Sequence, residues 1–422
     1  MQKSVVSIAK GTDPEKTLKE VLSPLGGVSS LIKPKSTVVI KPNAGHPAPA
    51  ESSVNTNPEV VAAVIKEIRT ANPKEIILAE AAAIGCETMM SLEVSGIKKA
   101  AEEAGVDKII DIKSEKDLIK IPIRDARSDM DRIRLPRFLI EAEHIVNLPI
   151  FKSHCSMVFT CALKNMKGVV SDKVHYQMHQ TNLAEAMMDL WSVIRPDLTI
   201  ADLLRPAEGY GPHTTLPVDF GCLVAGSDPV AIDATACRMV GLAIEDVDYF
   251  KPALERGIGN FDENLIEVRG KTIEEVYKPM WLPYLENLEK YSEYDIDTEG
   301  ACSSCLALVG LTMEKLKAIG EYDKNKDATI LVGRKKKIPE GIPPDQLILV
   351  GDCLKKYREQ GAYAKGCPPP EPYPLWSIVD RQDYVDFPPW VRERMAKEEK
   401  LFIEHQKELK EKWDKEKEGT GN

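Results

Sequence analysis

The stretch STVVIKPN, residues 36–43, decides the fold, because it is a short β-branched run that ends abruptly in Lys41, Pro42 and Asn43. Valine, isoleucine and threonine favour strands, and an apolar run without alternation is typical of a strand that is covered on both faces. Proline lacks the N–H group that a central strand needs, so we expect the strand to end here. The polar side chains of Lys41 and Asn43 then lie at the carboxyl end of the strand. The stretch therefore predicts a buried parallel strand with a polar loop beyond it.

The same pattern continues along the chain on both sides of this stretch. Helices are expected to begin at Asp13-Pro14, Asn57-Pro58 and Asp228-Pro229, because each pair joins a capping side chain to a first-turn proline. The expected strands cover 4–8, 36–41, 75–79, 144–151, 198–202 and 222–225, and a further helix covers 96–105. Strands that alternate with helices predict an α/β fold with a mostly parallel, doubly wound sheet. Ligands of such sheets bind beyond the carboxyl ends of the strands.

Composition divides the chain into four segments. We expect an α/β ligand-binding domain at 1–242, a helical connecting segment at 243–295, a four-cysteine metal-binding module at 296–385 with strands at 328–332 and 346–350, and a charged C-terminal helix and tail at 386–422. The terminal helix carries an apolar stripe of Val391, Met395, Phe402, Leu409 and Trp413. We expect this stripe to dock on the protein's own body, and the alternative is a partner or a homo-oligomer formed through this helix.

The bulk composition excludes several classes of protein. The 422 residues carry a net charge of −10 and show no basic cluster, which argues against nucleic acid as a partner. No apolar run approaches the about 20 residues of a membrane span, and the first residues lack the apolar core of a secretion signal. These features predict a cytoplasmic protein with no membrane partner. In the cytoplasm, the nine cysteines are expected to be buried thiols, metal ligands or catalytic groups, because disulfides are rare there.

Cys302, Cys305, Cys353 and Cys367 are the candidate metal ligands. The first two form a C-x2-C pair, whose sulfurs can turn toward one centre, and the other two arrive from separate loops. Four thiolates suit an iron–sulfur cluster or zinc, and reduced cysteines without metal are the third alternative. Proline directly follows Cys367, as it follows cluster cysteines in ferredoxins, and the C-x2-C pair has small apolar neighbours. We therefore predict one 4Fe–4S cluster in an anaerobic setting, with zinc as the alternative.

The richest polar stretch runs from 148 to 179, LPIFKSHCSMVFTCALKNMKGVVSDKVHYQMH. Lys152 and His154 follow an expected strand, and the turn LKNMKG supplies several more cations, amides and glycine backbone. His175 and His179 would share one helix face. Such a set suits a small anionic ligand, and a desolvated lysine can act as a base. The alternative interpretation is a basic loop that is exposed to solvent and binds no ligand.

Four ordered motifs carry a family resemblance: VVIKPN (38–43), NLPIFKSHCSMVFTCALKNMKG (147–168), TIADLLRPAEGYGP (199–212) and AGSDPVAIDATACRMVG (225–241). With them the chain resembles the family catalogued as domain of unknown function 362, over about residues 36–242. Members of this family are often associated with iron–sulfur clusters, and many carry a compact ferredoxin-like module. This chain lacks that module, so the resemblance implies one cluster close to an active site.

The resemblance also implies a shared set of site residues, namely Lys41, Asn43, Lys152, His154, Lys164, Asn165, Lys167, Gly168, Asp202, Glu208, Asp228 and Asp233. Of these, Lys152, His154 and Lys164 are the candidate catalytic residues. Lys41, Asn43, Asn165, Lys167, Gly168, Asp202 and Glu208 are the candidate substrate-binding residues, and Asp228 is expected to cap a helix.

The predicted function is an iron–sulfur oxidoreductase that acts on a small anionic substrate and exchanges electrons with a partner protein. The alternatives are a cluster-dependent lyase or isomerase, a non-catalytic metal or cluster carrier, and a structural-zinc protein. The sequence has no glycine-rich dinucleotide fingerprint and no Walker loop, so no nucleotide cofactor is expected. A flavin stays open, because no motif tests for it.

Overall fold

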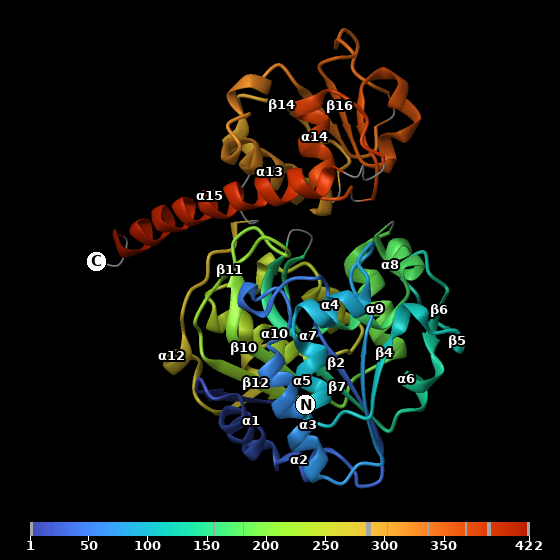
Figure 1. Ribbon diagram of the computed structural model, residues 1–422, viewed down its shortest axis with the longest axis vertical. Coiled ribbons are helices and arrows are strands. Elements are labelled where there is room, and N and C mark those ends of the chain that lie inside the picture. The colour runs from blue at the N-terminus through green and yellow to red at the C-terminus, as the bar shows by residue number, and fades with distance from the viewer. Residues whose placement is uncertain are drawn as a thin grey trace. The chain divides into compact units, whose positions relative to one another are not determined.

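The computed structural model of the chain describes residues 3–154, 157–179, 181–283, 288–301, 303–335, 337–367, 369–385 and 390–419. These residues form two compact units, whose elements are labelled in Figure 1. The first unit comprises Met1–Ser153, Phe159–Glu208 and Pro217–Met280. The second unit comprises His154–Val158, Gly209–Leu216 and Trp281–Asn422.

The first unit is built on a large sheet of mostly parallel strands. Along its main path the strands are β13 (Ile266–Gly270), β1 (Ser4–Lys10), β12 (Cys222–Gly226), β10 (Leu198–Glu208), β7 (His144–Leu148), β2 (Thr37–Pro42), β3 (Glu75–Glu80) and β4 (Lys108–Asp111). Strand β12 runs antiparallel to both of its neighbours, and the other neighbours along this path pair in parallel. The predicted mostly parallel sheet is confirmed, with β2 near its centre.

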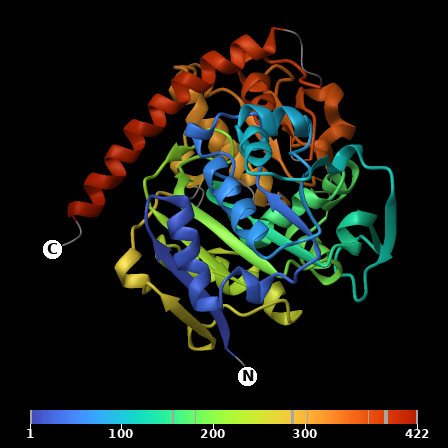
Figure 2. The same ribbon diagram turned by 60° about the horizontal axis from the view of Figure 1, so that its bottom comes forward.

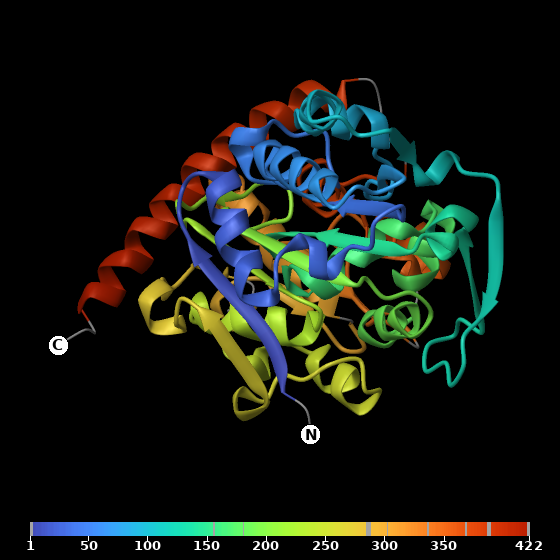
Figure 3. The same ribbon diagram turned by 90° about the horizontal axis from the view of Figure 1, so that it is seen from below.

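Helices cover both faces of this sheet. Helices α1 (Pro14–Leu22), α3 (Pro58–Thr70) and α5 (Ile97–Glu103) share a hydrophobic core with alternate strand residues such as Val38 and Ile40. Helix α10 (Pro229–Met239) packs on β1, β10 and β12. Figure 3 shows the blue helices on one face of the sheet and the green helices on the other. The predicted doubly wound architecture is confirmed.

The three predicted helix starts are confirmed at the level of single hydrogen bonds. The carboxylates of Asp13 and Asp228 and the side-chain oxygen of Asn57 each accept backbone N–H groups from the first turn of the following helix. In every case a proline occupies the first turn, where its missing N–H costs nothing. These helices therefore begin where the local sequence places them.

The expected single strand at 144–151 is two strands, β7 and β8 (Ile150–His154), which are separated by Pro149. Proline lacks the N–H that would continue the ladder, and the chain resumes pairing with β10 through Ile150 and Lys152 across an irregular register. The expectation that Lys152 and His154 follow a strand end is therefore wrong in detail, because both residues lie within β8.

The second unit has its own parallel sheet, in the order β14 (Asp295–Asp297), β15 (Thr329–Val332), β16 (Leu347–Val350) and β17 (Ala362–Ala364). Helices α13 (Ser303–Ala318) and α14 (Pro372–Asp380) pack with these strands around a shared apolar core. Both strands predicted here, at 328–332 and 346–350, are present.

The charged C-terminal helix is present as α15 (Val391–Gly419), drawn in red in Figure 2. Its stripe residue Phe402 is fully buried against Tyr210, and the Gln406 side chain accepts the N–H of Tyr210 at 2.8 Å and donates to the Thr214 carbonyl at 3.0 Å. The middle of α15 thus docks on its own unit. None of the described helices has the length and apolar character needed to cross a membrane.

Candidate functional site

A buried ion pair lies at the carboxyl ends of β2 and β3. The Lys41 ammonium lies 2.8 Å and 2.9 Å from the two carboxylate oxygens of Glu80, and both side chains are almost fully shielded from solvent. Burial lowers the pKa of Lys41 and raises the pKa of Glu80, and the attraction between the two opposes both shifts. Glu80 also accepts the N–H groups of Ala44 and Ala81 at 2.8 Å. The pair is thus held from several sides, as a buried ion pair must be.

Asparagine side chains extend this pair into a hydrogen-bonded network. The Asn165 oxygen accepts from Lys41 at 3.2 Å and from the Asn43 amide at 2.9 Å, while the Asn165 amide donates to the Asn147 oxygen at 2.8 Å. Asn147 in turn donates to the backbone carbonyl of Ala162. The network fixes the LKNMKG turn against the strand ends and leaves the Asn43 oxygen available to Lys152.

Lys152 is the most chemically distinctive residue of the site. Its ammonium donates to the Asn43 oxygen at 3.1 Å and to the backbone carbonyl of Val54, and only 3% of the residue is exposed. Burial, followed by repulsion from Lys164, lowers the pKa of Lys152 from 10.5 to about 7. A lysine with a pKa near the operating pH exists in both protonation states, which is the property of an effective acid–base group.

Gly168 is required by the close approach of the LKNMKG turn to the buried ion pair. A β-carbon at this position would lie 2.2 Å from a Glu80 oxygen and 2.4 Å from the Lys41 nitrogen. The Gly168 carbonyl also accepts the N–H of Ala81 at 2.9 Å. Gly168 therefore frames the site and lets the turn reach the strand ends.

Helix α8 (Asp172–His179) brings two neutral imidazoles to the same region. His175 is buried and His179 is half-buried on this helix, and the Lys167 nitrogen lies 2.8 Å from the His179 ring nitrogen. Burial, followed by repulsion from Lys167 and Lys164, holds the pKa of both histidines well below 6.5. The Nδ1 atom of His175 is buried and has no hydrogen-bond partner in the described part of the chain. A buried polar atom without a partner is costly, and a bound ligand would satisfy it.

A second group of side chains follows β3 and β4. Lys113 donates to the carbonyls of Ala83 and Cys86 at 2.9 Å each and pairs with Asp172 at 2.6 Å. The Cys86 sulfur lies 3.3 Å from a ring nitrogen of His46, in the loop after Asn43. Burial raises the pKa of the Cys86 thiol, so Cys86 stays protonated.

Lysines gather around these strand ends. They are Lys41, Lys113, Lys152, Lys164 and Lys167; Glu80 pairs with Lys41, Asp172 pairs with Lys113, and Glu208 is a further buried acid at the end of β10. The imidazoles add no negative charge. Several ammonium groups that lie together with little solvent attract anions.

Two predicted site residues, Asp202 and Asp233, accept hydrogen bonds from backbone N–H groups of the protein. The oxygens of Asp202, which lies within β10, accept the N–H groups of Asn57 at 2.9 Å and Leu204 at 3.0 Å. The oxygens of Asp233 accept the first N–H groups of α7 (Ala162–Asn165) at 2.6 Å and 3.1 Å. Burial raises the pKa of Asp202 to about 6 and that of Asp233 to about 7. Both carboxyls therefore anchor the frame around the lysines.

The remaining predicted residues lie close to these elements. Lys164 is half-buried on α7, and Lys167 is buried on the turn that follows it. Glu208 is buried at the end of β10, whereas His154 is buried at the end of β8 and belongs to the second unit. Sequence reasoning missed Glu80 by ending its strand one residue early, although an acid at a strand end is a usable signal.

The cysteines of the second unit gather at the carboxyl edge of its parallel sheet. Cys353 follows β16, Cys367 follows β17, and Cys305 lies in the first turn of α13. A β-carbon at Gly351 would lie 3.7 Å from the Cys353 sulfur and 3.9 Å from the Cys305 sulfur, so both sulfurs face the same point. The N–H of Asp352 donates to the Gly366 carbonyl at 2.8 Å, which ties the loops of Cys353 and Cys367 together.

The donor chemistry of this edge fits a thiolate-bound metal only in part. Within the described ranges, no group of three or more His, Cys, Asp or Glu residues is close enough to hold a metal ion, and Cys302 lies outside those ranges. A hollow of about 670 Å³ is lined by the sulfur-bearing Cys353 and by Asp352, Lys355, Lys356 and Arg358.

A known protein family matches the region from β2 to α10. The family described as Domain of unknown function (DUF362) matches residues 38–238. A thylakoid-associated protein of Synechocystis is 30% identical over 233 residues, which are 51% of this chain and 67% of that protein.

Two solved structures are more distant. A crystal structure of a Thermotoga maritima protein is 16% identical, with a TM-score of 0.34, over 49% of this chain and 54% of that one. The lactate racemase apoprotein of Thermoanaerobacterium thermosaccharolyticum is 14% identical, with a TM-score of 0.36, over 57% of each chain. The chain thus spans little more than half of either solved protein.

Proposed function

The chain belongs to the family of the domain of unknown function DUF362, and we propose that it is an iron–sulfur oxidoreductase that acts on a small anionic substrate. Its substrate site is the lysine and asparagine cluster at the carboxyl ends of β2, β3 and β8. Its cluster ligands are Cys302, Cys305, Cys353 and Cys367.

The observation that carries the proposal is Lys152, a buried lysine whose pKa is lowered to about 7 inside an anion-attracting site. A structural lysine would be fully charged and paired with an acid. Lys152 instead donates to an amide oxygen and a backbone carbonyl, and the largest effect of a charged neighbour on its pKa comes from another lysine, Lys164. This environment supports an acid–base role.

The side chains of the substrate site have different roles in the proposed reaction. The field of Lys164, Lys167 and Lys113 attracts and orients a carboxylate or phosphate group of the substrate. Neutral Lys152 accepts a proton from the bound substrate, or its ammonium form donates one in the reverse direction. Asn43 holds the Lys152 nitrogen in place during this transfer, because its side-chain oxygen accepts a hydrogen bond from that nitrogen.

The cysteine edge of the second unit supports the redox half of the proposal. Cys305, Cys353 and Cys367 come from separate segments to one edge of the sheet, and Cys302 would complete the set. A cluster held by these residues would supply single-electron transfer. Zinc is the alternative occupant, because it takes the same four thiolates.

A lyase or isomerase is the second candidate function, and Lys152 is the specific observation that favours it. Proton abstraction next to a carboxylate needs a base that is neutral near pH 7 and a cationic surrounding for the developing negative charge. The lysine cluster offers both, even without a change in oxidation state.

The proposed compartment is the cytoplasm. The name of the Synechocystis relative associates that protein with thylakoids, so attachment to a membrane surface through a partner is the alternative for this chain. Fractionation of cells that produce the full chain distinguishes the two.

Calorimetric titration of the full chain with oxalate tests the substrate site. At pH 6, where Lys152 with its pKa of about 7 is mostly protonated, we expect binding that weakens at least about tenfold in Lys152→Ala and in Lys164→Ala, because hydrogen bonds to charged groups each contribute about 1.5–3 kcal/mol. Lys99→Ala is the matched control, since that side chain is 81% exposed. The metal content should be unchanged in all three variants. Equal oxalate affinity in all variants, or loss of metal with loss of Lys152, would contradict the proposal.

A further inference from the structure

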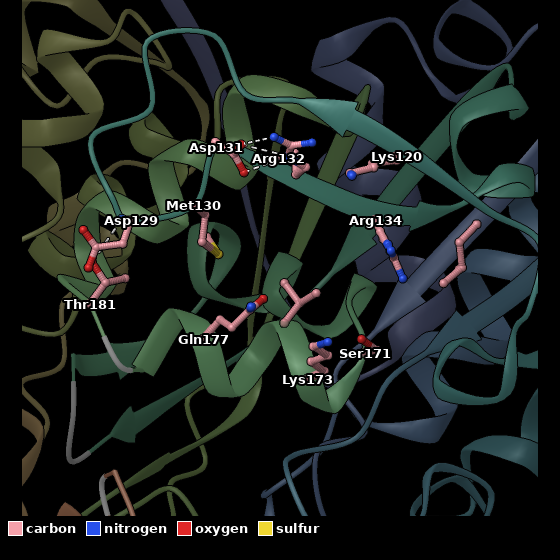
Figure 4. A pocket seen from close by; sticks show the side chains of 12 residues that line it. Lys120, Asp129, Met130, Asp131, Arg132, Arg134, Ser171, Lys173, Gln177 and Thr181 are labelled. Carbon is pink, nitrogen blue, oxygen red and sulfur yellow. Dashed lines mark hydrogen bonds and ion pairs between the residues drawn. The ribbon is translucent and has the colours of Figure 1, made fainter.

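A second hollow lies in the first unit, between a two-stranded ribbon and helix α8. The ribbon consists of β5 (Leu118–Pro122) and β6 (Arg132–Pro136), which pair with each other and with no other described strand. Figure 4 shows the hollow from close by, with ribbon residues on one side and α8 residues on the other. Its volume is about 500 Å³, within the range of about 300–1,000 Å³ for small-molecule sites.

Strand alternation gives this ribbon two unlike faces. Lys120, Arg132 and Arg134 are exposed on the face that lines the hollow. Ile133 and Leu135 are buried on the opposite face. The apolar face of the ribbon packs on the protein, so the three cations on the opposite face point toward the hollow.

The cationic face is electrostatically unfavourable as it stands. Lys120 lies directly opposite Arg134 in the register of the two strands, and like charges placed opposite each other in a ladder destabilise it. Lys173, on the first turn of α8, adds a cation from the other wall. In the described part of the chain Lys120, Arg134 and Lys173 form no ion pair, whereas Arg132 is held by Asp131. A bound anion would relieve this repulsion.

Helix α8 separates the hollow from the lysine cluster. Lys173 and Gln177 line the hollow, while Asp172 pairs with Lys113 and His175 faces the lysines of the buried site. The two regions therefore use different faces of one helix. The hollow is a separate site, and its occupant does not enter the reaction at Lys152.

We propose that this hollow binds a small ligand with several negative charges, of the phosphate-ester or pyrophosphate class. The Arg134 guanidinium offers the forked donors that match phosphate oxygens, and the ammonium groups of Lys120 and Lys173 add charge. The lining also contains Asp129 and Asp131, and Asp131 neutralises Arg132. Ser171, Gln177 and Thr181 supply neutral donors along the wall. The concave shape and the mixed donors fit a compact polyanion better than an extended acidic peptide.

Calorimetric titration of the full chain with inorganic pyrophosphate tests this proposal. The double variant Lys120→Gln/Arg134→Gln should weaken pyrophosphate binding at least about tenfold, since it removes two charged donors. Lys116→Gln/Arg124→Gln removes the same charge from exposed positions of the same segment that do not line the hollow, and it should leave the affinity unchanged. Both doubles should unfold at the wild-type temperature or above, because all four side chains are exposed.

Further arms of the titration separate this site from the others. Lys152→Met should keep pyrophosphate affinity at the hollow, whatever happens to oxalate binding. An oligoglutamate peptide should bind at least about tenfold more weakly than pyrophosphate, since it cannot enter a concave site of this size. Equal loss in the two double variants, loss in Lys152→Met, no measurable pyrophosphate binding, or equal binding of the peptide would each overturn the proposal.

Discussion

Replacing Lys152 with methionine should change the stability of the protein in a way that depends on pH. Methionine has a similar length and no charge, so it fills the same space in β8 without an ammonium group. At pH 6 we expect the variant to be at its most stable relative to the wild type, and by pH 10 we expect that advantage to be lost and slightly reversed.

The magnitude follows from the lowered pKa of Lys152. A fall from 10.5 to about 7 corresponds to a cost of about 5 kcal/mol for holding the charged form in the folded state. Loss of the hydrogen bonds to Asn43 and Val54 offsets part of this gain in the variant, by about 1 kcal/mol each. The net advantage at pH 6 is therefore about 3 kcal/mol.

The direction follows from proton counting. Below pH 7 the folded and unfolded chains both carry the proton on Lys152, and the folded state bears the full cost. Between pH 7 and 10.5 the unfolded chain holds the proton and the folded chain does not, so wild-type stability rises with pH by about 1.4 kcal/mol per unit. Above 10.5 neither state is charged and the cost is absent.

Urea unfolding of both proteins at several pH values between 6 and 10 measures this difference, because other titrating groups cancel between them. Lys99→Met, at an exposed position, is the control and should give a difference that is flat with pH. A flat difference for Lys152→Met as well would show that Lys152 is an ordinary charged lysine, and the acid–base proposal would fail with it.

Three further predictions concern the frame of the site and the second unit. Gly168→Ala should destabilise the protein by about 3 kcal/mol, because the new β-carbon would clash with the buried ion pair. Gly45→Ala is the control and should be nearly neutral, because open space surrounds that position. Thermal unfolding measures both variants. Lys41→Met should cost about 3–5 kcal/mol by leaving Glu80 unpaired, and adding Glu80→Gln should recover most of it; failure of the double variant to recover would contradict the pairing. The pKa of Glu314 is lowered to about 2, since hydrogen bonds from a histidine and a tyrosine outweigh its burial, so Glu314→Gln should cost about 3 kcal/mol at neutral pH. This difference should disappear as the pH falls from 4.5 to 2 in acid unfolding of the second unit.

Much of the fold could be predicted because its signals are local. The run at residues 36–41 is apolar on both faces, and the pairs at Asp13, Asn57 and Asp228 combine a cap with a proline, so neither feature depends on distant residues. The division of 144–151 into two strands was not predicted. It depends on how the chain resumes pairing with β10 after Pro149, which only the neighbouring strand decides.

The residue types of the candidate site could be predicted from the sequence, but the contacts between these residues could be predicted less well. Lys41, Lys152 and Asn165 could be singled out as polar residues in apolar surroundings, and the structure brings them into one network. The partner role of Glu80 and the capping role of Asp233 depend on contacts across more than thirty residues of chain. Such contacts follow from packing of the sheet and its helices, and no spacing in the sequence encodes them.

The metal content of the anaerobically purified full chain distinguishes an iron–sulfur cluster from zinc. We expect a coloured protein with about four irons and about four sulfides per chain. Both should be lost in Cys305→Ala and Cys353→Ala and kept in Cys222→Ala, which lies in β12 of the other unit. A colourless protein with one zinc per chain would contradict the iron–sulfur oxidoreductase.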